Sequence, residues 1–144
     1  MTFLLDVNVL IALIDAAHIH HDLAHDWFAR QGARAWSTCP LTQNGVLRVV
    51  GHPQYPNGPG SPAAVAPLMM ELCNHPGHAF WPDDMSLLDR THVESERLLS
   101  SSQITDTFLL ALAKSNGGKL ATFDRRLVTS AVREGAASLH VIKS

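Results

Sequence analysis

A chain of 144 residues, 46% of them hydrophobic and 17% charged, suits one compact domain and is neither disordered nor fibrous in composition. Its formal net charge of -2 excludes nucleic-acid binding through bulk charge, so any such role needs a local basic patch. Cys39 and Cys73 lack metal-site spacing, and no stretch approaches the roughly 20 apolar residues of a membrane span. We therefore expect a single cytoplasmic domain over residues 1–144.

Strands and helices are expected to alternate along the chain. They are a strand over 2–5, helices over 7–14 and 20–31, a strand over 33–37, helices over 40–51 and 63–74, a strand over 78–81, helices over 86–99 and 104–115, a strand over 119–123, a short helix, and a last strand over 139–142. Asp83 and Asp84 are expected to cap the helix over 86–99. This alternation predicts an α/β fold with a mostly parallel sheet of about five strands, covered on both faces.

Three aspartates are expected at one edge of this sheet. Asp6 directly follows the first strand, Asp124 follows the strand over 119–123, and Asp106 lies in the first turn of the helix over 104–115. The carboxyl ends of parallel strands meet at one edge, and right-handed crossovers make these elements neighbours. Ligands of open α/β sheets bind at that edge.

Each aspartate alone is well suited to capping a helix, a role that contributes about 0.5–2 kcal/mol. Together they pose a different problem, because two carboxylates about 4 Å apart repel by about 4 kcal/mol at a surface-like dielectric. No lysine lies near any of the three in sequence, although Arg125 and Arg126 follow Asp124. Such a cluster indicates an external cation, and carboxylate oxygens favour Mg²⁺ or Mn²⁺.

Several motifs, in their order and spacing, resemble those of the PIN-domain family. The main ones are Asp6-Val7-Asn8, Thr105-Asp106 at the start of an Ala/Leu-rich helix, and Leu120-Ala121-Thr122-Phe123-Asp124. His18, His21, Trp27 and the segment FWPDD at 80–84 are similar to the VapC-type toxins of bacterial toxin–antitoxin pairs. The resemblance spans essentially the whole chain.

The resemblance implies a PIN-like α/β/α sandwich and a Mg²⁺- or Mn²⁺-dependent endoribonuclease that hydrolyses RNA phosphodiester bonds. Members are usually dimeric and are held inactive by a VapB-type antitoxin. Carried over by position, Asp6 and Asp106 would bind the metal directly, and Asp124 would complete the acidic pocket, in part through water. Asn8 and Thr122 would orient neighbouring carboxylates through hydrogen bonds.

One position departs from the family pattern. The second acid of the family is usually a Glu in the helix after the second strand, where this chain has Gln43, followed by Asn44. A carboxamide can accept a hydrogen bond but brings no charge and cannot act as a base. We still expect catalysis from the remaining carboxylates, with Gln43 in the site. Arg48, Arg125 and Arg126 are candidates for contact with RNA phosphates, or are solvated surface charges.

Two other functions remain open on the sequence. In one, the chain is a PIN-like module that Gln43 has weakened as a catalyst and that only binds RNA or an antitoxin. In the other, the histidines of the stretch HIHHDLAH (18–25) form the zinc site of a hydrolase, since His21 and His25 are one helical turn apart. That stretch lacks Cys or acid partners at usable spacing, so helix capping and packing are favoured for it.

Overall fold

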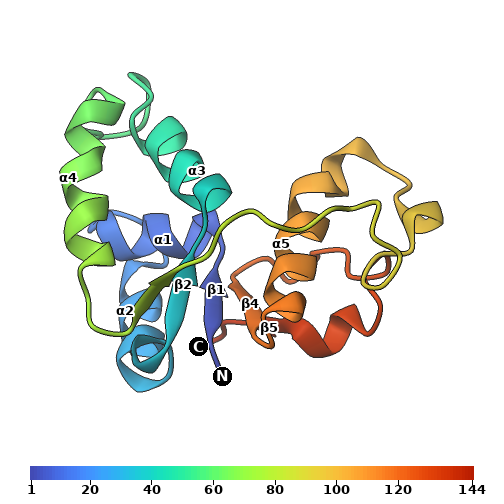
Figure 1. Ribbon diagram of the computed structural model, residues 1–144. Coiled ribbons are helices and arrows are strands. Elements are labelled where there is room, and N and C mark those ends of the chain that lie inside the picture. The colour runs from blue at the N-terminus through green and yellow to red at the C-terminus, as the bar shows by residue number, and fades with distance from the viewer.

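The structure is a computed structural model that describes all of residues 1–144, and it contains one five-stranded sheet flanked by helices (Figure 1). The strands are β1 (Phe3–Leu5), β2 (Trp36–Thr38), β3 (His78–Phe80), β4 (Lys119–Thr122) and β5 (Leu139–Val141). Their order across the sheet is β3-β2-β1-β4-β5, and every neighbouring pair is parallel. The predicted parallel α/β sheet is thus confirmed. None of the helices combines the length and the apolar character that crossing a bilayer requires.

Four helices pack on one side of the sheet, which we call the α1–α4 face. They are α1 (Val7–Ile14), α2 (His21–Arg30), α3 (Pro40–Val50) and α4 (Pro62–Cys73). Their apolar sides enclose Leu5 of β1 and Trp36 of β2, which are both fully buried. α3 packs closely on α1 because Gly45 has no side chain, and a Cβ there would come within 2.7 Å of Val7. This contact fixes α1, whose first residue follows Asp6.

The opposite side of the sheet, the α5 face, carries a single long helix, α5 (Ile104–Ser115). Residues 109–113 of α5 are fully buried against Leu4 and Leu120, the strand residues that alternate with those of the α1–α4 face. Gly117 ends the helix with a φ of +72°, which glycine adopts without steric cost. The prediction of a buried helix over 104–115 is confirmed.

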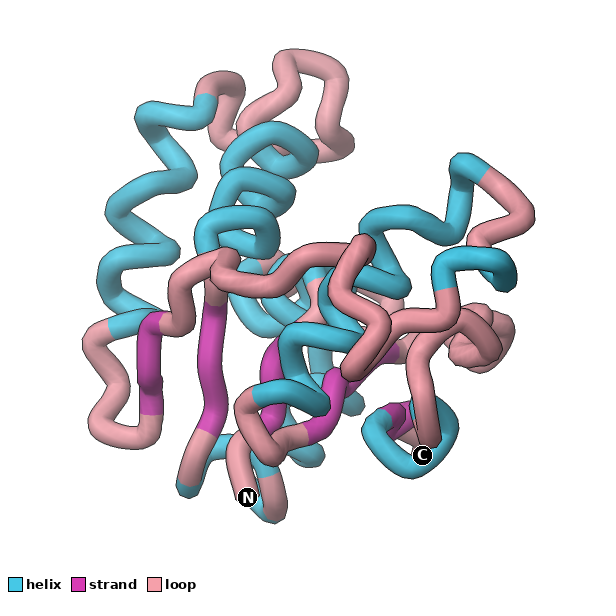
Figure 2. The backbone as a smooth tube through the Cα atoms, turned by 45° about the vertical axis from the view of Figure 1, so that its right-hand side comes forward, coloured by secondary structure: helices cyan, strands magenta, loops and turns pink.

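The helix expected over 86–99 does not exist, so the expectation that Asp83 and Asp84 cap it is wrong. The segment between β3 and α5 consists of turns, an extended stretch and the short 3₁₀ helices Ser95–Arg97 and Ser101–Gln103, and it crosses the molecule as a loop (Figure 2). Ser86 and Asp89 accept hydrogen bonds from backbone N–H groups two residues on, which compete with helix formation. Leu88 and Leu99 are 82% and 85% exposed, so the segment has no continuous apolar side whose burial would stabilise a helix.

The short helix expected after Asp124 is also absent up to the 3₁₀ helix Gly135–Ser138. Backbone groups of this segment bond instead to the segment between β3 and α5, because Val132 forms an antiparallel bridge with Val93. The N–H of Glu94 donates to the carbonyl of Ala131, and the N–H of Arg133 donates to the carbonyl of His92. These long-range bonds join the two irregular segments to each other and close the α5 face without an α-helix in either.

Candidate active site

The carboxyl ends of β1 and β4 lie side by side and bring Asp6 next to Thr122. Leu5 pairs with Ala121, and the N–H of Asp6 continues the ladder by donating to the carbonyl of Ala121 over 2.9 Å. Asp6 is then the N-cap of α1, so its side chain stays at the edge of the sheet and is only 8% exposed.

The Asp6 carboxylate is held by two hydrogen bonds. Oδ1 accepts from the backbone N–H of Val7 at 2.8 Å, and Oδ2 accepts from the hydroxyl of Thr122 at 2.8 Å. That hydroxyl oxygen in turn accepts from Nδ2 of Asn8 at 3.1 Å and from the N–H of Asp124 at 3.1 Å. Asp6, Asn8, Thr122 and the start of the Asp124 turn thus form one connected network.

Asp106 and Asp124 complete the acidic edge from other elements. Asp106, on the first turn of α5, is half-buried and makes no hydrogen bond with its side chain. Burial raises its pKa above the usual aspartate value, and the charges of Asp6 and Asp124 raise it further. Asp124 is exposed, and its Oδ1 accepts from the N–H of Arg126 at 2.8 Å.

Asp6 is under the same electrostatic influence. Burial raises the pKa of its carboxyl, the hydrogen bonds from Thr122 and Val7 oppose this, and the charge of Asp124 adds to the increase. No lysine or arginine neutralises any of the three aspartates, since all the ion pairs of the structure join other residues. The acids therefore repel one another without an internal counter-charge.

The donor set fits a hard divalent cation in its chemistry, because carboxylate oxygens are the ligands that Mg²⁺ and Mn²⁺ prefer. The carboxylate of Asp106 makes no hydrogen bond within the protein, so the lone pairs of both its oxygens are available to a cation. No three Asp, Glu, His or Cys side chains anywhere in the chain converge closely enough to share one ion. The structure thus brings the three aspartates to one edge without closing them into a finished metal cage.

The side chain of Gln43 forms its hydrogen bond with a residue outside this cluster. Its Nε2 donates to the hydroxyl oxygen of Thr38 at 3.0 Å, and that oxygen lies 2.7 Å from Nε2 of His78. Gln43 also lines a small pocket between α3 and α4, together with Met69 and Cys73. The carboxamide links α3 to β2 and β3, and it makes no hydrogen bond to any of the aspartates.

Comparison with known proteins agrees with this geometry. The sequence pattern of the PIN domain matches residues 3–132. Ribonuclease VapC44 of Mycobacterium tuberculosis is 41% identical over 141 residues, which are 98% of each chain. Ribonuclease VapC39 of the same organism is 37% identical over 131 residues, 91% of this chain and 94% of that one. The chain belongs to the VapC group of the PIN-domain family.

A solved structure shows the same fold at greater distance. The crystal structure of Mycobacterium tuberculosis VapC20, described as a sarcin–ricin loop cleaving toxin, superposes with a TM-score of 0.60 at 18% identity. The match covers 92% of this chain and 97% of VapC20. The PIN-like sandwich expected from the sequence is therefore present in this VapC-type chain.

The three arginines proposed as phosphate contacts lie in different places in this VapC-type fold. Arg125 and Arg126 follow Asp124 directly and are exposed. Arg48 lies on α3 and lines a separate pocket with His52 and Tyr55, residues of the loop between α3 and α4. Arg125 and Arg126 are thus beside the acids by position in the chain, whereas no contact joins Arg48 to them.

The histidine stretch of this PIN domain has a structural role. Nδ1 of His21 lies 2.7 Å from the carbonyl oxygen of Ala12, and Nε2 of His25 lies 2.7 Å from that of Leu13. Both carbonyls belong to the last turn of α1, where helical partners run out. The capping interpretation of these histidines is confirmed by their contacts, and no third Asp, Glu, His or Cys side chain joins the pair to complete a metal site.

Two long-range contacts were not expected from the sequence. The Tyr55 hydroxyl donates to Asp15, which ties the Pro/Gly-rich loop over 51–61 to the end of α1. The imidazole of His20 stacks on Phe123, with ring centroids 4.8 Å apart. Both pairs join residues more than 30 positions apart in aperiodic segments, so no local pattern could indicate them.

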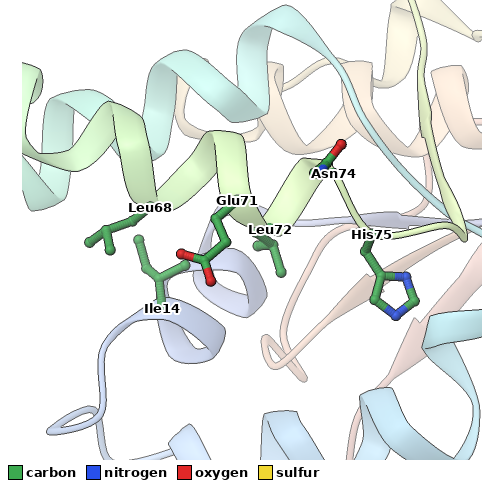
Figure 3. Close-up of a pocket in the computed structure, with 6 residues that line it drawn as sticks. All are labelled: Ile14, Leu68, Glu71, Leu72, Asn74 and His75. Carbon is green, nitrogen blue, oxygen red and sulfur yellow. The ribbon is translucent and has the colours of Figure 1, made fainter.

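A hollow lined by residues of α1 and α4 and of the turn after α4 is separate from the acidic edge. Ile14, Leu68, Leu72, Glu71, Asn74 and His75 line it (Figure 3). The Glu71 carboxylate and the His75 ring are drawn on opposite sides of Leu72 and do not approach each other (Figure 3). None of the three aspartates contributes to its lining, so it adds nothing to the site described above.

Proposed function

We propose that this protein is a metal-dependent endoribonuclease, a toxin of the VapC kind that a cognate VapB-type antitoxin neutralises. Relatives named as ribonucleases support the reaction class. The observation that carries the proposal is the arrangement of Asp6, Asp106 and Asp124, which influence one another's charge at one edge of the sheet and have no basic partner.

In this proposal Asp6 and Asp106 bind Mg²⁺ or Mn²⁺ directly, and Asp124 completes the pocket through water. A divalent ion held there would supply Lewis-acid chemistry, polarising the scissile phosphate and lowering the pKa of a bound water. The hydrogen bonds from Thr122 and from the N–H of Val7 each occupy one lone pair of the Asp6 carboxylate and fix its orientation, which leaves its remaining lone pairs for the ion. Asn8 holds the Thr122 hydroxyl in place and orients Asp6 through it.

The raised pKa values of Asp6 and Asp106 give the reaction an acid limit. Both carboxyls must be ionised to hold a cation, and burial disfavours their ionisation. Metal affinity therefore falls as the pH decreases, beginning at a higher pH than for an ordinary aspartate. Excess metal shifts this limit to lower pH, because cation and proton compete for the same oxygens.

The test is cleavage of a labelled structured RNA with Mg²⁺, with Mn²⁺, and with EDTA. Asp6→Asn and Asp106→Asn should each lower the rate by about 100-fold or more, because each removes a proposed metal ligand. Asp22→Asn is the matched control, since Asp22 is exposed on α2 and its side chain forms no hydrogen bond or ion pair. Equal cleavage by all four proteins, or cleavage that persists in EDTA, would contradict the proposal.

A second candidate is a PIN-like module that binds RNA or its antitoxin without cutting. It is favoured by Gln43, which supplies no charge where the family usually has Glu and which bonds to Thr38 instead. Gel-shift and cleavage assays on the same RNA separate the two functions. Binding without cleavage at any concentration of Mg²⁺ or Mn²⁺ would establish the module and exclude the enzyme.

The proposed antitoxin inserts apolar side chains into a groove and places an Arg or Lys near the acids, where it displaces the cation. A pocket of ≈ 200 Å³ between α3 and α4, lined mainly by apolar residues with the exposed Met70 at its margin, offers such a groove. If a co-purified partner binds equally well after all three aspartates are changed to Ala, the charge-based part of this inhibition is wrong.

A homodimer and a cytoplasmic location complete the proposal. Exposed apolar side chains on α4 and β3, among them Met70 and Phe80, suit a subunit interface. Cys39 and Cys73 are both free thiols, which is typical of a reducing compartment. Light scattering coupled to size-exclusion chromatography measures the mass, and a monomeric mass at micromolar concentration would exclude the dimer.

A further inference from the structure

A pocket of ≈ 730 Å³ lies along β5, the edge strand of the sheet, and it belongs to no part of the acidic site. Its lining includes Arg125, Thr129, Leu139, His140, Val141 and Lys143. β5 pairs with β4 on one side only, so its outer side has no neighbouring strand. The pocket is thus an open hollow with a polar side, and no element of the chain covers it.

The two cations of this β5 pocket lie at the same edge of the sheet as the aspartates. Arg125 directly follows Asp124, and Lys143 follows the carboxyl end of β5. β4 and β5 are parallel, with Thr122 paired to Val141, so their carboxyl ends meet. A chain lying in the β5 pocket would therefore continue toward Asp124.

The charge of the β5 pocket is positive and unpaired. Neither Arg125 nor Lys143 forms an ion pair, and no Asp or Glu belongs to the lining. His140 adds no charge, because its Nε2 accepts the indole N–H of Trp27 at 3.0 Å. Burial, and then the charge of Lys119, lower the pKa of His140, which keeps the ring neutral. In a chain of net charge -2, this pocket is a local site for a polyanion.

We propose that the β5 pocket binds the sugar-phosphate backbone of the RNA substrate on the Asp124 side of the scissile bond. This assignment rests on the proposed nuclease function. An acidic edge repels RNA, so the substrate needs cations beside the aspartates to hold it there. Arg125 and Lys143 contact phosphates, the Thr129 hydroxyl is free to donate a further hydrogen bond, and Leu139 and Val141 form an apolar wall for the sugars.

The experiment measures binding without cleavage. A short fluorescein-labelled oligouridylate is titrated with protein in EDTA at several NaCl concentrations, and its anisotropy is followed. Arg125→Ala/Lys143→Ala should lower the affinity at low salt by about tenfold or more. It should also reduce the slope of log K against log salt by about 1.4, since each phosphate contact with a single strand contributes about 0.7. Both residues are exposed, so folding is preserved, which a thermal melt verifies.

Arg34→Ala is the matched control. Arg34 is also exposed and forms no ion pair, but it precedes β2, at the amino ends of the strands, whereas the aspartates lie at the carboxyl ends. An unchanged slope in the double variant, or an equal loss in the Arg34→Ala protein, would overturn the assignment. Displacement of the RNA by poly-glutamate at equal charge concentration would assign the pocket to an acidic protein instead.

This test is independent of the cleavage assay. If the double variant binds RNA normally while Asp6→Asn abolishes cleavage, the β5 pocket is excluded and the nuclease remains. If the wild-type protein binds RNA through the pocket but never cleaves it, the nuclease is excluded and the RNA-binding site remains.

Discussion

The two faces of the sheet differ in how they are covered, and the acidic site lies between them. The α1–α4 face is packed by four regular helices, whereas the α5 face has one long helix and two irregular segments joined by the Val93–Val132 bridge. Asp6 lies between the end of β1 and the start of α1, and two hydrogen bonds fix its carboxylate. Asp106 comes from α5 and has none. One half of the site is therefore preorganised, and the other half is positioned by α5 alone.

The largest effect is expected when a buried leucine is removed from the core on either face of the sheet. Leu10→Ala on the α1–α4 face and Leu109→Ala on the α5 face each remove a fully buried side chain, so each should cost about 2–5 kcal/mol of unfolding free energy. Urea denaturation followed by circular dichroism measures both. A cost below about 1 kcal/mol for Leu109→Ala alone would mean that the irregular segments leave the α5 face loosely packed.

Thr122 tests the preorganised half of the site. Thr122→Val keeps the shape but removes the hydroxyl that donates to Asp6 and accepts from Asn8, so metal affinity should fall by about 10–100-fold. Thr122→Ser retains the hydroxyl and should stay close to wild type. Isothermal titration with Mn²⁺ compares the three proteins, and equal affinities would show that Asp6 needs no support from Thr122.

Tyr55 tests how firmly the α3–α4 loop is tied to the α1–α4 face. Burial and the bond to Asp15 raise the pKa of Tyr55 to about 12, and the bond lowers the pKa of Asp15. Tyr55→Phe should cost about 1 kcal/mol at neutral pH, the usual contribution of such a hydrogen bond at a partly exposed site. Because the folded-state pKa of Asp15 is lowered, this difference is present above its ordinary value of 3.8 and disappears as the pH falls through the folded-state pKa. A cost that stays constant down to acid pH would show that Asp15 is not the acceptor.

The smallest effect concerns the unsupported half of the site. The pKa of Asp106 is raised, so its ionisation destabilises the metal-free protein as the pH rises through that pKa. Asp106→Asn should therefore raise the melting temperature in EDTA at pH 7 by about 1–2 °C, a gain kept small by its partial exposure. Excess Mn²⁺ should stabilise the wild type but not this variant. A lower melting temperature for Asp106→Asn in EDTA would show that the acids do not repel one another.

Sequence patterns predicted the parts of the molecule that local periodicity controls. The apolar run before Asp6 and the buried helix over 104–115 follow from hydrophobic pattern, and so do the parallel strands between them. The position of three aspartates at one edge follows from topology. The irregular segments could not be predicted, because their backbone groups bond across 39 positions, from Val93 to Val132, and helical propensity is overridden there.

The candidate site was predictable in its residues more than in its contacts. Asp6 and Thr122 meet because β1 and β4 pair in register, which the topology makes probable but the sequence does not state. The bond of Gln43 to Thr38 depends on which way one carboxamide turns, and no periodic pattern encodes that. The β5 pocket combines residues of the irregular segment after β4, the 3₁₀ helix Gly135–Ser138, and β5 with Lys143 beyond it, and only the fold brings these together.

The Val93–Val132 bridge has a consequence for how the protein opens. The amides of Glu94 and Arg133 donate across it in opposite directions, so separation of the two segments releases both amides. In hydrogen–deuterium exchange these two amides should exchange together, as one cooperative unit. Amides of β1 and β4, enclosed between both cores, should exchange only when the whole domain unfolds.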